Sequence, residues 1–188
     1  SGRSNEQAPS LQGRGRAVTI LALDLSLTAT GWAHDYDGKL QYGTQSTSHR
    51  GVDRLYDLDY WLSCMTWGVL PDLAVIEGYS YAARGSALFQ IAEWGGVARL
   101  NLFKDRTPYI EVPPAVLKKY ATGRGNATKP DMRMALYKRS GLDVADDNAV
   151  DAIWLLAIGR QLVGDPLWEL PKAQVDALDK LEVPEGVL

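Results

Sequence analysis

The segment AVTILALD, residues 17–24, decides the fold. It is a short apolar run that ends in a carboxylate, the pattern of a strand buried on both faces of a sheet. Two more strand-like segments follow, TGWAHDY (30–36) and KLQYGTQ (39–45), and Asp37-Gly38 between them is a typical hairpin-turn pair. The sequence therefore predicts a sheet whose first three strands are antiparallel neighbours.

The rest of the chain alternates between helical and strand patterns. Apolar residues recur at helical spacing in several segments, and glycine pairs at 95–96 and 123–125 are expected to interrupt two of them. Strands are expected at LAVIE (73–77) and PYIEV (108–112), and helices at 53–68, 86–103, 115–140 and 146–163. This order predicts an α/β fold with a five-stranded mixed sheet flanked by helices.

The length of 188 residues suits one folded domain. Residues 1–16 are polar and rich in Gly and Ser, which predicts a disordered arm that either contacts nucleic acid or is solvated. Residues 17–163 form the expected domain, and 164–188 are an acidic extension with a short surface helix.

Cysteine content and hydropathy indicate a cytoplasmic protein. A single cysteine excludes an internal disulfide framework, and Cys64 lies among apolar residues where we expect a core thiol. No apolar run approaches the roughly 20 residues needed to span a bilayer, and no apolar block typical of a secretory signal opens the chain.

The net charge of −3 argues, taken alone, against nucleic-acid binding. The charges are unevenly distributed, however. Residues 113–139 carry seven cations against Asp131, whereas 165–188 carry six acids against two lysines. A positive segment broken by glycines suits contact with phosphates through side chains and backbone N–H groups, and a solvated helix face is the alternative.

Four carboxylates are placed where chemistry is expected. Asp24 and Glu77 end two strands, and neighbouring strands would hold them about 5–6 Å apart. Asp147 and Asp151 are four residues apart, share a helix face, and would be kept ionised by the helix dipole. Converging carboxylates need a cation, and oxygen ligands select Mg²⁺ or Mn²⁺. Alternatively, Asp24 caps a turn and Asp147 caps a helix.

Four stretches cover nearly all of 17–163: ILALDLSLTATGWA (20–33), DLAVIEGYSYAARGSALFQIAEWGGVA (72–98), VPPAVLKKYATGRGNATKPDM (112–132) and DDNAVDAIWLLAIG (146–159). The first has an apolar strand, Asp, a Thr-containing loop and Gly, and the second has Glu after an apolar strand. The third has paired Lys and Thr-Gly-x-Gly-x-Ala-x-Lys, and the fourth is an acidic closing helix. These stretches resemble the motifs of the RuvC-type Holliday junction resolvases and occur in the family's order.

The resemblance implies an RNase H-like fold and a homodimeric endonuclease that nicks four-way DNA junctions symmetrically and leaves 5′-phosphates. Asp24, Glu77 and Asp151 match three family acids by position, and the fourth metal ligand is either Asp147 or Asn148. Two Mg²⁺ ions per site, replaceable by Mn²⁺, would carry the hydrolysis. The Asp-Asp-Asn-x-x-Asp helix looks most like bacteriophage members of the family.

The family also places an aromatic residue shortly after the Glu, at the junction centre. Here Ser80 occupies that position between Tyr79 and Tyr81, either of which is a candidate base-stacking wedge or a partly buried tyrosine. Lys118 and Lys129 match the family's lysines best. The full set expected to bind DNA is Tyr79, Tyr81, Arg84, Lys118, Lys119, Arg124, Lys129 and Arg133.

Other functions fit parts of the pattern. A phage nuclease of the same type could cleave branched DNA more broadly, during replication or packaging. A non-catalytic junction-binding protein could share the fold, although it would have no reason to hold the acids at 24, 77 and 151. Actin-like sugar and acetate kinases begin with a similar strand and Asp, but they need about twice this length.

Overall fold

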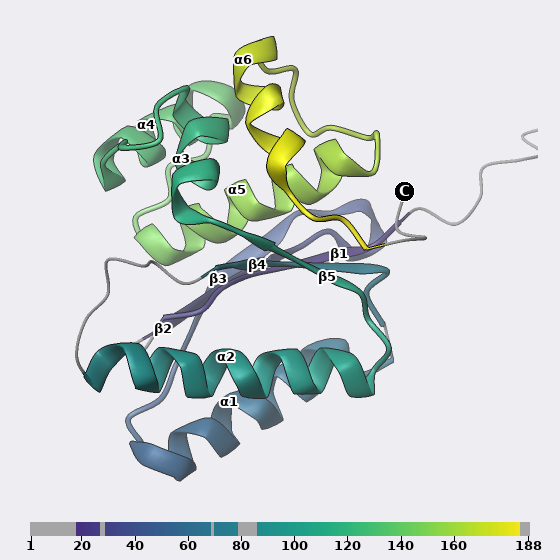
Figure 1. Cartoon of the computed structure of the whole chain (residues 1–188), viewed down its shortest axis with the longest axis vertical. Coiled ribbons are helices and arrows are strands. Elements are labelled where there is room, and N and C mark those ends of the chain that lie inside the picture. The colour runs from purple at the N-terminus through teal and green to yellow at the C-terminus, as the bar shows by residue number, and fades with distance from the viewer. Residues whose placement is uncertain (1–17, 27–28, 69, 79–85, 185–188) are drawn as a thin grey trace, which may run out of the picture.

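A computed structural model describes residues 18–26, 29–68, 70–78 and 86–184. A five-stranded sheet separates two layers of helices: α1 and α2 cover one face, and α5 covers the other with α3, α4 and α6 outside it (Figure 1). In chain order the elements are β1 (Ile20–Asp24), β2 (Ala29–His34), β3 (Gln41–Ser46), α1 (Gly51–Thr66), β4 (Leu73–Glu77), α2 (Ser86–Lys104), β5 (Tyr109–Val112), α3 (Pro114–Thr122), α4 (Lys129–Ser140), α5 (Asp147–Leu162) and α6 (Lys172–Val175).

The strand order β3-β2-β1-β4-β5 confirms the predicted mixed sheet. The first three strands pair antiparallel, and β1, β4 and β5 are parallel. The hairpin between β2 and β3 differs from the expected two-residue turn, because one turn of 3-10 helix, Tyr36–Gly38, joins them. Asp35 lies at this turn, where its carboxylate accepts the N–H of Ile20 and binds Arg160.

Alternation along the strands divides the core in two. Leu21 and Leu23 of β1 pack against α1 and α2, while Ile20 and Ala22 pack against α5. By the same alternation, Asp24 faces the α5 side. The second half of α5 is apolar on almost every side. This fits a helix that is enclosed between the sheet and the outer helices.

Helix α2 runs unbroken through Gly95-Gly96, where we expected an interruption. Tertiary packing explains the continuity, because Trp94, Ala98 and Leu102 are buried on the sheet. The Trp94 indole N–H also donates to Thr30 Oγ1 at 2.9 Å. These contacts outweigh the roughly 1 kcal/mol that each glycine costs a helix.

The structure bears on two expectations about the surface. The short helix after residue 163 is α6, whose Gln174 side-chain amide donates to the Tyr120 carbonyl, and Leu178 just beyond it is buried. Cys64 is exposed on the outer side of α1 and is not a core thiol. Over the described ranges, none of the helices combines the length and apolar character that crossing a membrane requires.

Candidate active site: a carboxylate cluster where β1, β4 and α5 meet

Three carboxylates from distant parts of the chain meet at one end of the sheet. The register pairs Leu23 with Ile76, so the next residues, Asp24 and Glu77, lie side by side at the carboxyl ends of β1 and β4. Asp151 reaches them from the first turns of α5. One ligand oxygen from each of the three lies within 4.8 Å of the others. The predicted convergence of these acids is present.

Gly31 allows α5 to approach this end of the sheet. It pairs with Asp24 across the β1–β2 ladder. A Cβ on Gly31 would lie 2.1 Å from the backbone oxygen of Asn148 and 2.4 Å from its carbonyl carbon. The first turn of α5 therefore rests on a position that only glycine can fill, and Asp151 is one turn further on.

The start of α5 is set by Asp146, whose carboxylate accepts the N–H of Ala149 at 3.0 Å. The helix-cap role considered for Asp147 therefore belongs to Asp146. Asp147 is the first residue of α5, and Asn148 lies against Gly31 through its backbone.

Burial and mutual repulsion act together on the cluster. Asp24 is 6% exposed, and burial raises its pKa well above the usual range, with a hydrogen bond to Glu77 and the charges of Glu77 and Asp151 adding to the rise. Burial, followed by the charge of Glu77, raises the pKa of Asp151 to about 7. Burial therefore outweighs the helix dipole that we expected to keep Asp151 ionised.

Two lysines border the carboxylates. Lys129 lowers the pKa of both Asp24 and Asp151, and Lys118 lowers that of Asp151, although burial dominates in each case. The Lys129 ammonium lies 3.5 Å from the Asp147 carboxylate. Lys129 is placed there because Thr128 and Asp131 form a reciprocal capping box at the start of α4.

The remaining predicted residues are distributed around the basic helices. Arg124 pairs with Asp131 at 3.1 Å, Lys119 is exposed, and Arg133 is partly buried. Tyr79, Tyr81 and Arg84 lie outside the described residues. Sequence reasoning missed the contact role of Gly31, although its position in the Thr-Gly that opens the second strand was the available signal.

The donor set suits a hard divalent cation. All three cluster ligands are carboxylate oxygens, the ligand type that Mg²⁺ and Mn²⁺ prefer. Burial and then the neighbouring carboxylates raise the pKa of Asp24 and Asp151, so ionising these acids together is unfavourable. A bound cation would offset both the burial cost and the repulsion between the carboxylates.

The sheet is mixed and has helices on both of its faces, and the carboxylates lie where β1, β4 and α5 meet. This arrangement defines an RNase H-like fold with a candidate metal centre.

No family model matches the chain. Two proteins named crossover junction endodeoxyribonuclease RuvC are similar to it: that of Neorickettsia sennetsu is 31% identical over 135 residues, covering 68% of this chain and 81% of that protein. That of Sorangium cellulosum is 30% identical over 160 residues, covering 76% and 87%.

Solved structures agree on the fold. Thermus thermophilus RuvC, in a complex with a Holliday junction substrate, superposes with a TM-score of 0.64 at 15% identity and covers 80% of this chain and all of that one. The yeast mitochondrial Holliday junction resolvase Ydc2 gives a TM-score of 0.50 at 12% identity, covering 72% and 75%. The chain belongs to the RuvC family of crossover junction endodeoxyribonucleases. The expected bacteriophage origin stays a prediction.

Proposed function

We propose that this chain is a divalent-metal-dependent endonuclease that resolves four-way DNA junctions by paired nicks and leaves 5′-phosphates. The observation that carries the proposal is the gathering of Asp24, Glu77 and Asp151 within 4.8 Å in a member of the RuvC family. A merely junction-binding relative would gain nothing from three carboxylates that repel one another at a partly buried site. Such an enzyme would act in the cytoplasm, as we expected from the sequence.

Asp24, Glu77 and Asp151 would hold the cations. Two Mg²⁺ ions, or Mn²⁺ in their place, would supply an activated water and stabilise the leaving oxygen of a phosphodiester. The chain's part is to fix the oxygens: β1 and β4 hold two of them in register, and Gly31 lets α5 bring the third.

We infer that Asp147 is the fourth ligand in preference to Asn148, because a second anionic oxygen binds Mg²⁺ more tightly than an amide. The charge of Asp147 contributes to the raised pKa of Asp151, which supports their proximity. Lys129 would then lie beside the metal centre, at 3.5 Å from Asp147. Alanine substitutions of Asp147 and Asn148, compared in parallel for Mg²⁺ dependence, identify the ligand by the larger loss.

DNA would lie across the basic helices next to this site. Lys118 and Lys129 border the carboxylates, and Lys119, Arg124 and Arg133 continue the positive surface over α3 and α4. These cations would hold phosphates and orient the strand, without reading its sequence. Tyr79, Tyr81 and Arg84 stay predicted contacts at the junction centre.

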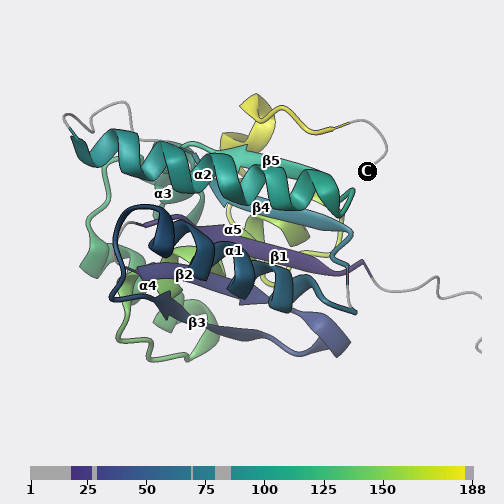
Figure 2. The same cartoon turned by 90° about the horizontal axis from the view of Figure 1, so that it is seen from below.

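The chain would act as a homodimer, because paired nicks need two active sites related by a two-fold axis. Figures 1 and 2 show α1 and α2 side by side on the face of the sheet opposite α5. Their outer sides carry large exposed apolar residues at helical spacing, and Trp67 is 85% exposed. We propose that this α1–α2 surface, comprising Val52, Tyr56, Tyr60, Trp67, Phe89 and Leu100, is covered by a second copy.

Sedimentation velocity tests the dimer. Tyr60→Glu places a charge in the centre of the α1–α2 surface and should convert the dimer to a monomer. Tyr137→Glu is the matched control, because Tyr137 is a similarly exposed tyrosine on α4, outside that surface. A wild-type monomer at micromolar concentration, or equal dissociation by both variants, would remove the proposed interface.

The function is tested by comparing four substrates with Mg²⁺ present: a four-way junction, a flap, a fork and a linear duplex. We expect paired nicks near the centre of the junction and little cleavage of linear duplex. Comparable cleavage of flap, fork and junction would make the chain a broader debranching nuclease. Equal cleavage of all four, linear duplex included, would contradict the resolvase function.

A further inference from the structure

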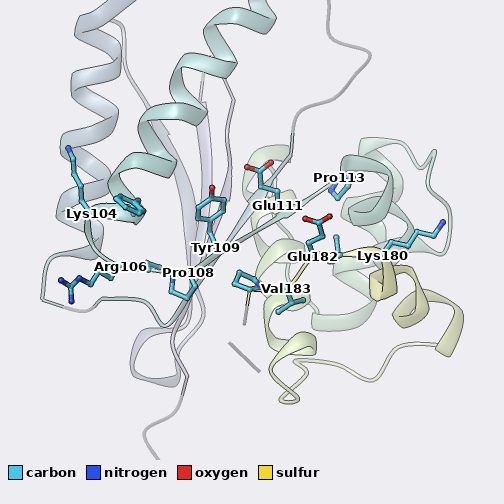
Figure 3. A pocket seen from close by; sticks show the side chains of 13 residues that line it. Lys104, Arg106, Pro108, Tyr109, Glu111, Pro113, Lys180, Glu182 and Val183 are labelled. Atoms are coloured by element: carbon cyan, nitrogen blue, oxygen red, sulfur yellow. The ribbon is translucent and has the colours of Figure 1, made fainter. Parts of the chain in front are cut away.

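A large groove lies along the free edge of the sheet. It is formed by the end of α2, the turn into β5, β5 itself and the segment 180–184 (Figure 3). Its volume is about 1410 Å³, and none of its lining residues belongs to the carboxylate cluster or to the DNA-binding set. The proposed nuclease activity therefore leaves it unused.

The backbone of β5 presents unpaired hydrogen-bonding groups to this groove. Over the described residues β5 pairs only with β4. Its even-numbered residues face β4, since the carbonyls of Pro108 and Val112 accept the N–H groups of Ala74 and Gly78. The N–H and C=O groups of Tyr109 and Glu111 therefore point the other way, at the spacing that an added strand would match.

The lining of the groove combines apolar side chains with cations. Phe103 is 76% exposed and belongs to this lining. Tyr109, Pro108 and Val183 add further apolar surface (Figure 3). Three exposed cations line the groove, and none of them forms an ion pair among the described residues: Lys104, Arg106 and Lys180.

The acids in the groove do not balance these cations. Glu111 is already paired with Arg99 at 3.1 Å. Glu182 is therefore the one acid in the lining whose charge is left to offset the charges of the three cations. The excess charge is positive, and it lies beside exposed apolar surface.

Arg106 occupies its position at a cost to stability. Among the described residues it is the only non-glycine residue with a positive φ, at 57°. It follows the end of α2, where its N–H donates to the Phe103 carbonyl, and glycine is the preferred residue at such a helix end. A guanidinium in this position is favoured by something other than local backbone energy.

We propose that this groove binds an extended, acidic segment of a partner protein that carries a large apolar side chain, added as a strand to the edge of β5. The outward N–H and C=O groups of Tyr109 and Glu111 would supply the main-chain bonds. Phe103 and Tyr109 would contact the apolar side chain, while Lys104, Arg106 and Lys180 would attract the acids.

The probe is a fluorescein-labelled synthetic octapeptide in which Asp alternates with Val and the last residue is Phe, titrated with the full chain by fluorescence anisotropy. We expect a Kd in the micromolar range, on the order of 10 µM. Two altered peptides test the two recognition elements. Lysine in place of each Asp, or N-methylation of alternate amides, should each weaken binding at least about tenfold, a loss of about 1.4 kcal/mol.

Protein variants locate the site. Lys104→Glu and Arg106→Gly should each weaken binding of the Asp-Val peptide at least about fivefold, whereas Lys39→Glu, an exposed lysine at the β2–β3 turn, should leave it unchanged. Arg106→Gly should also raise the Tm, which separates lost binding from misfolding. Junction cleavage by Arg106→Gly should equal that of wild type, so this inference can fail without the nuclease function failing.

Three outcomes would overturn the proposal. The first is no binding at about 1 mM peptide, and the second is binding that alternate N-methylation leaves unchanged. The third is a loss of junction affinity, in place of peptide affinity, in Arg106→Gly, which would make the groove a DNA contact.

Discussion

Gly31→Ala is the substitution that most directly tests how the active site is assembled. The added Cβ would lie 2.1 Å from the backbone oxygen of Asn148, whereas an ordinary contact needs at least 3.4 Å. The first turn of α5 must therefore retreat by about 1.3 Å, or β2 must move by a similar amount. Rotating a side chain cannot relieve this clash, because the two closest atoms belong to the Asn148 backbone.

The displacement acts on catalysis more than on stability. Overpacking of this kind costs about 1–3 kcal/mol of unfolding free energy. A shift of about 1 Å in a catalytic group can cost on the order of a hundredfold in rate. Because Asp151 moves with α5 while Asp24 and Glu77 stay in the sheet, we expect at least that loss in junction nicking and a higher Mg²⁺ requirement.

Gly159→Ala is the matched control. It is the same substitution on the same interface, since a Cβ at Gly159 would lie 2.9 Å from methyl groups of Ile20 and Val75. Gly159 is eight residues beyond Asp151, roughly 12 Å along α5. Thermal melts should show both variants destabilised, whereas single-turnover nicking at low temperature should fall only in Gly31→Ala. If Gly31→Ala nicks the junction at the wild-type rate and with wild-type Mg²⁺ dependence, then Gly31 is not needed to position Asp151.

Three further predictions follow from the charges. Burial raises the pKa of Asp151 to about 7 and raises that of Asp24 well above its usual range, so the metal-free fold retains protons that the unfolded chain releases above about pH 4. Its unfolding free energy should therefore fall as pH rises toward 7. Mg²⁺ should therefore raise the Tm more at about pH 8 than at about pH 5.5, and Asp24→Asn should reduce that difference; an equal Tm shift at both pH values would contradict it. Lys129→Met removes a charge that lowers the pKa of both carboxyls, so the acidic limb of the pH–rate profile should move to higher pH, whereas an unmoved limb would place Lys129 away from the site. Asp35→Asn removes the buried carboxylate partner of Arg160 and leaves it only the exposed carboxylate of Asp165. The substitution should cost about 3–5 kcal/mol of unfolding free energy by urea denaturation, with nicking by the folded fraction unchanged; a loss below about 1 kcal/mol would show that the Asp35–Arg160 pair contributes little.

The sequence predicted the sheet and its acids because short-range patterns determine them. The apolar runs ending in Asp24 and Glu77 are recognisable without tertiary information, and parallel neighbours necessarily bring strand ends together. The helical spacing of Asp147 and Asp151 likewise indicated a shared face. The spacing could not show that the two acids have different neighbours: Asp151 lies beside Asp24 and Glu77, while Asp147 meets Lys129 from another helix.

The errors arose where tertiary contacts override local preference. Packing of Trp94 on the sheet keeps α2 continuous through a glycine pair. Cys64 follows the apolar pattern of α1 but lies on its outer side, where apolar residues are exposed. An apolar residue on a helix looks the same in sequence whether it faces the core or a partner. The groove beside β5 had no sequence signal, because residues about 75 positions apart form it.

The central claim is that the carboxylate cluster cuts the junction and does not merely hold it. To separate junction binding from junction cleavage, both are measured for Asp24→Asn on one four-way junction with Mg²⁺ present. Asp143→Asn is the control, because Asp143 is exposed. We expect Asp24→Asn to bind the junction about as tightly as wild type but to nick it at least about a hundredfold more slowly, since losing even a hydrogen-bond partner of a metal ligand costs about 10–100-fold. If Asp24→Asn nicks as fast as Asp143→Asn, the cluster is not the catalytic centre.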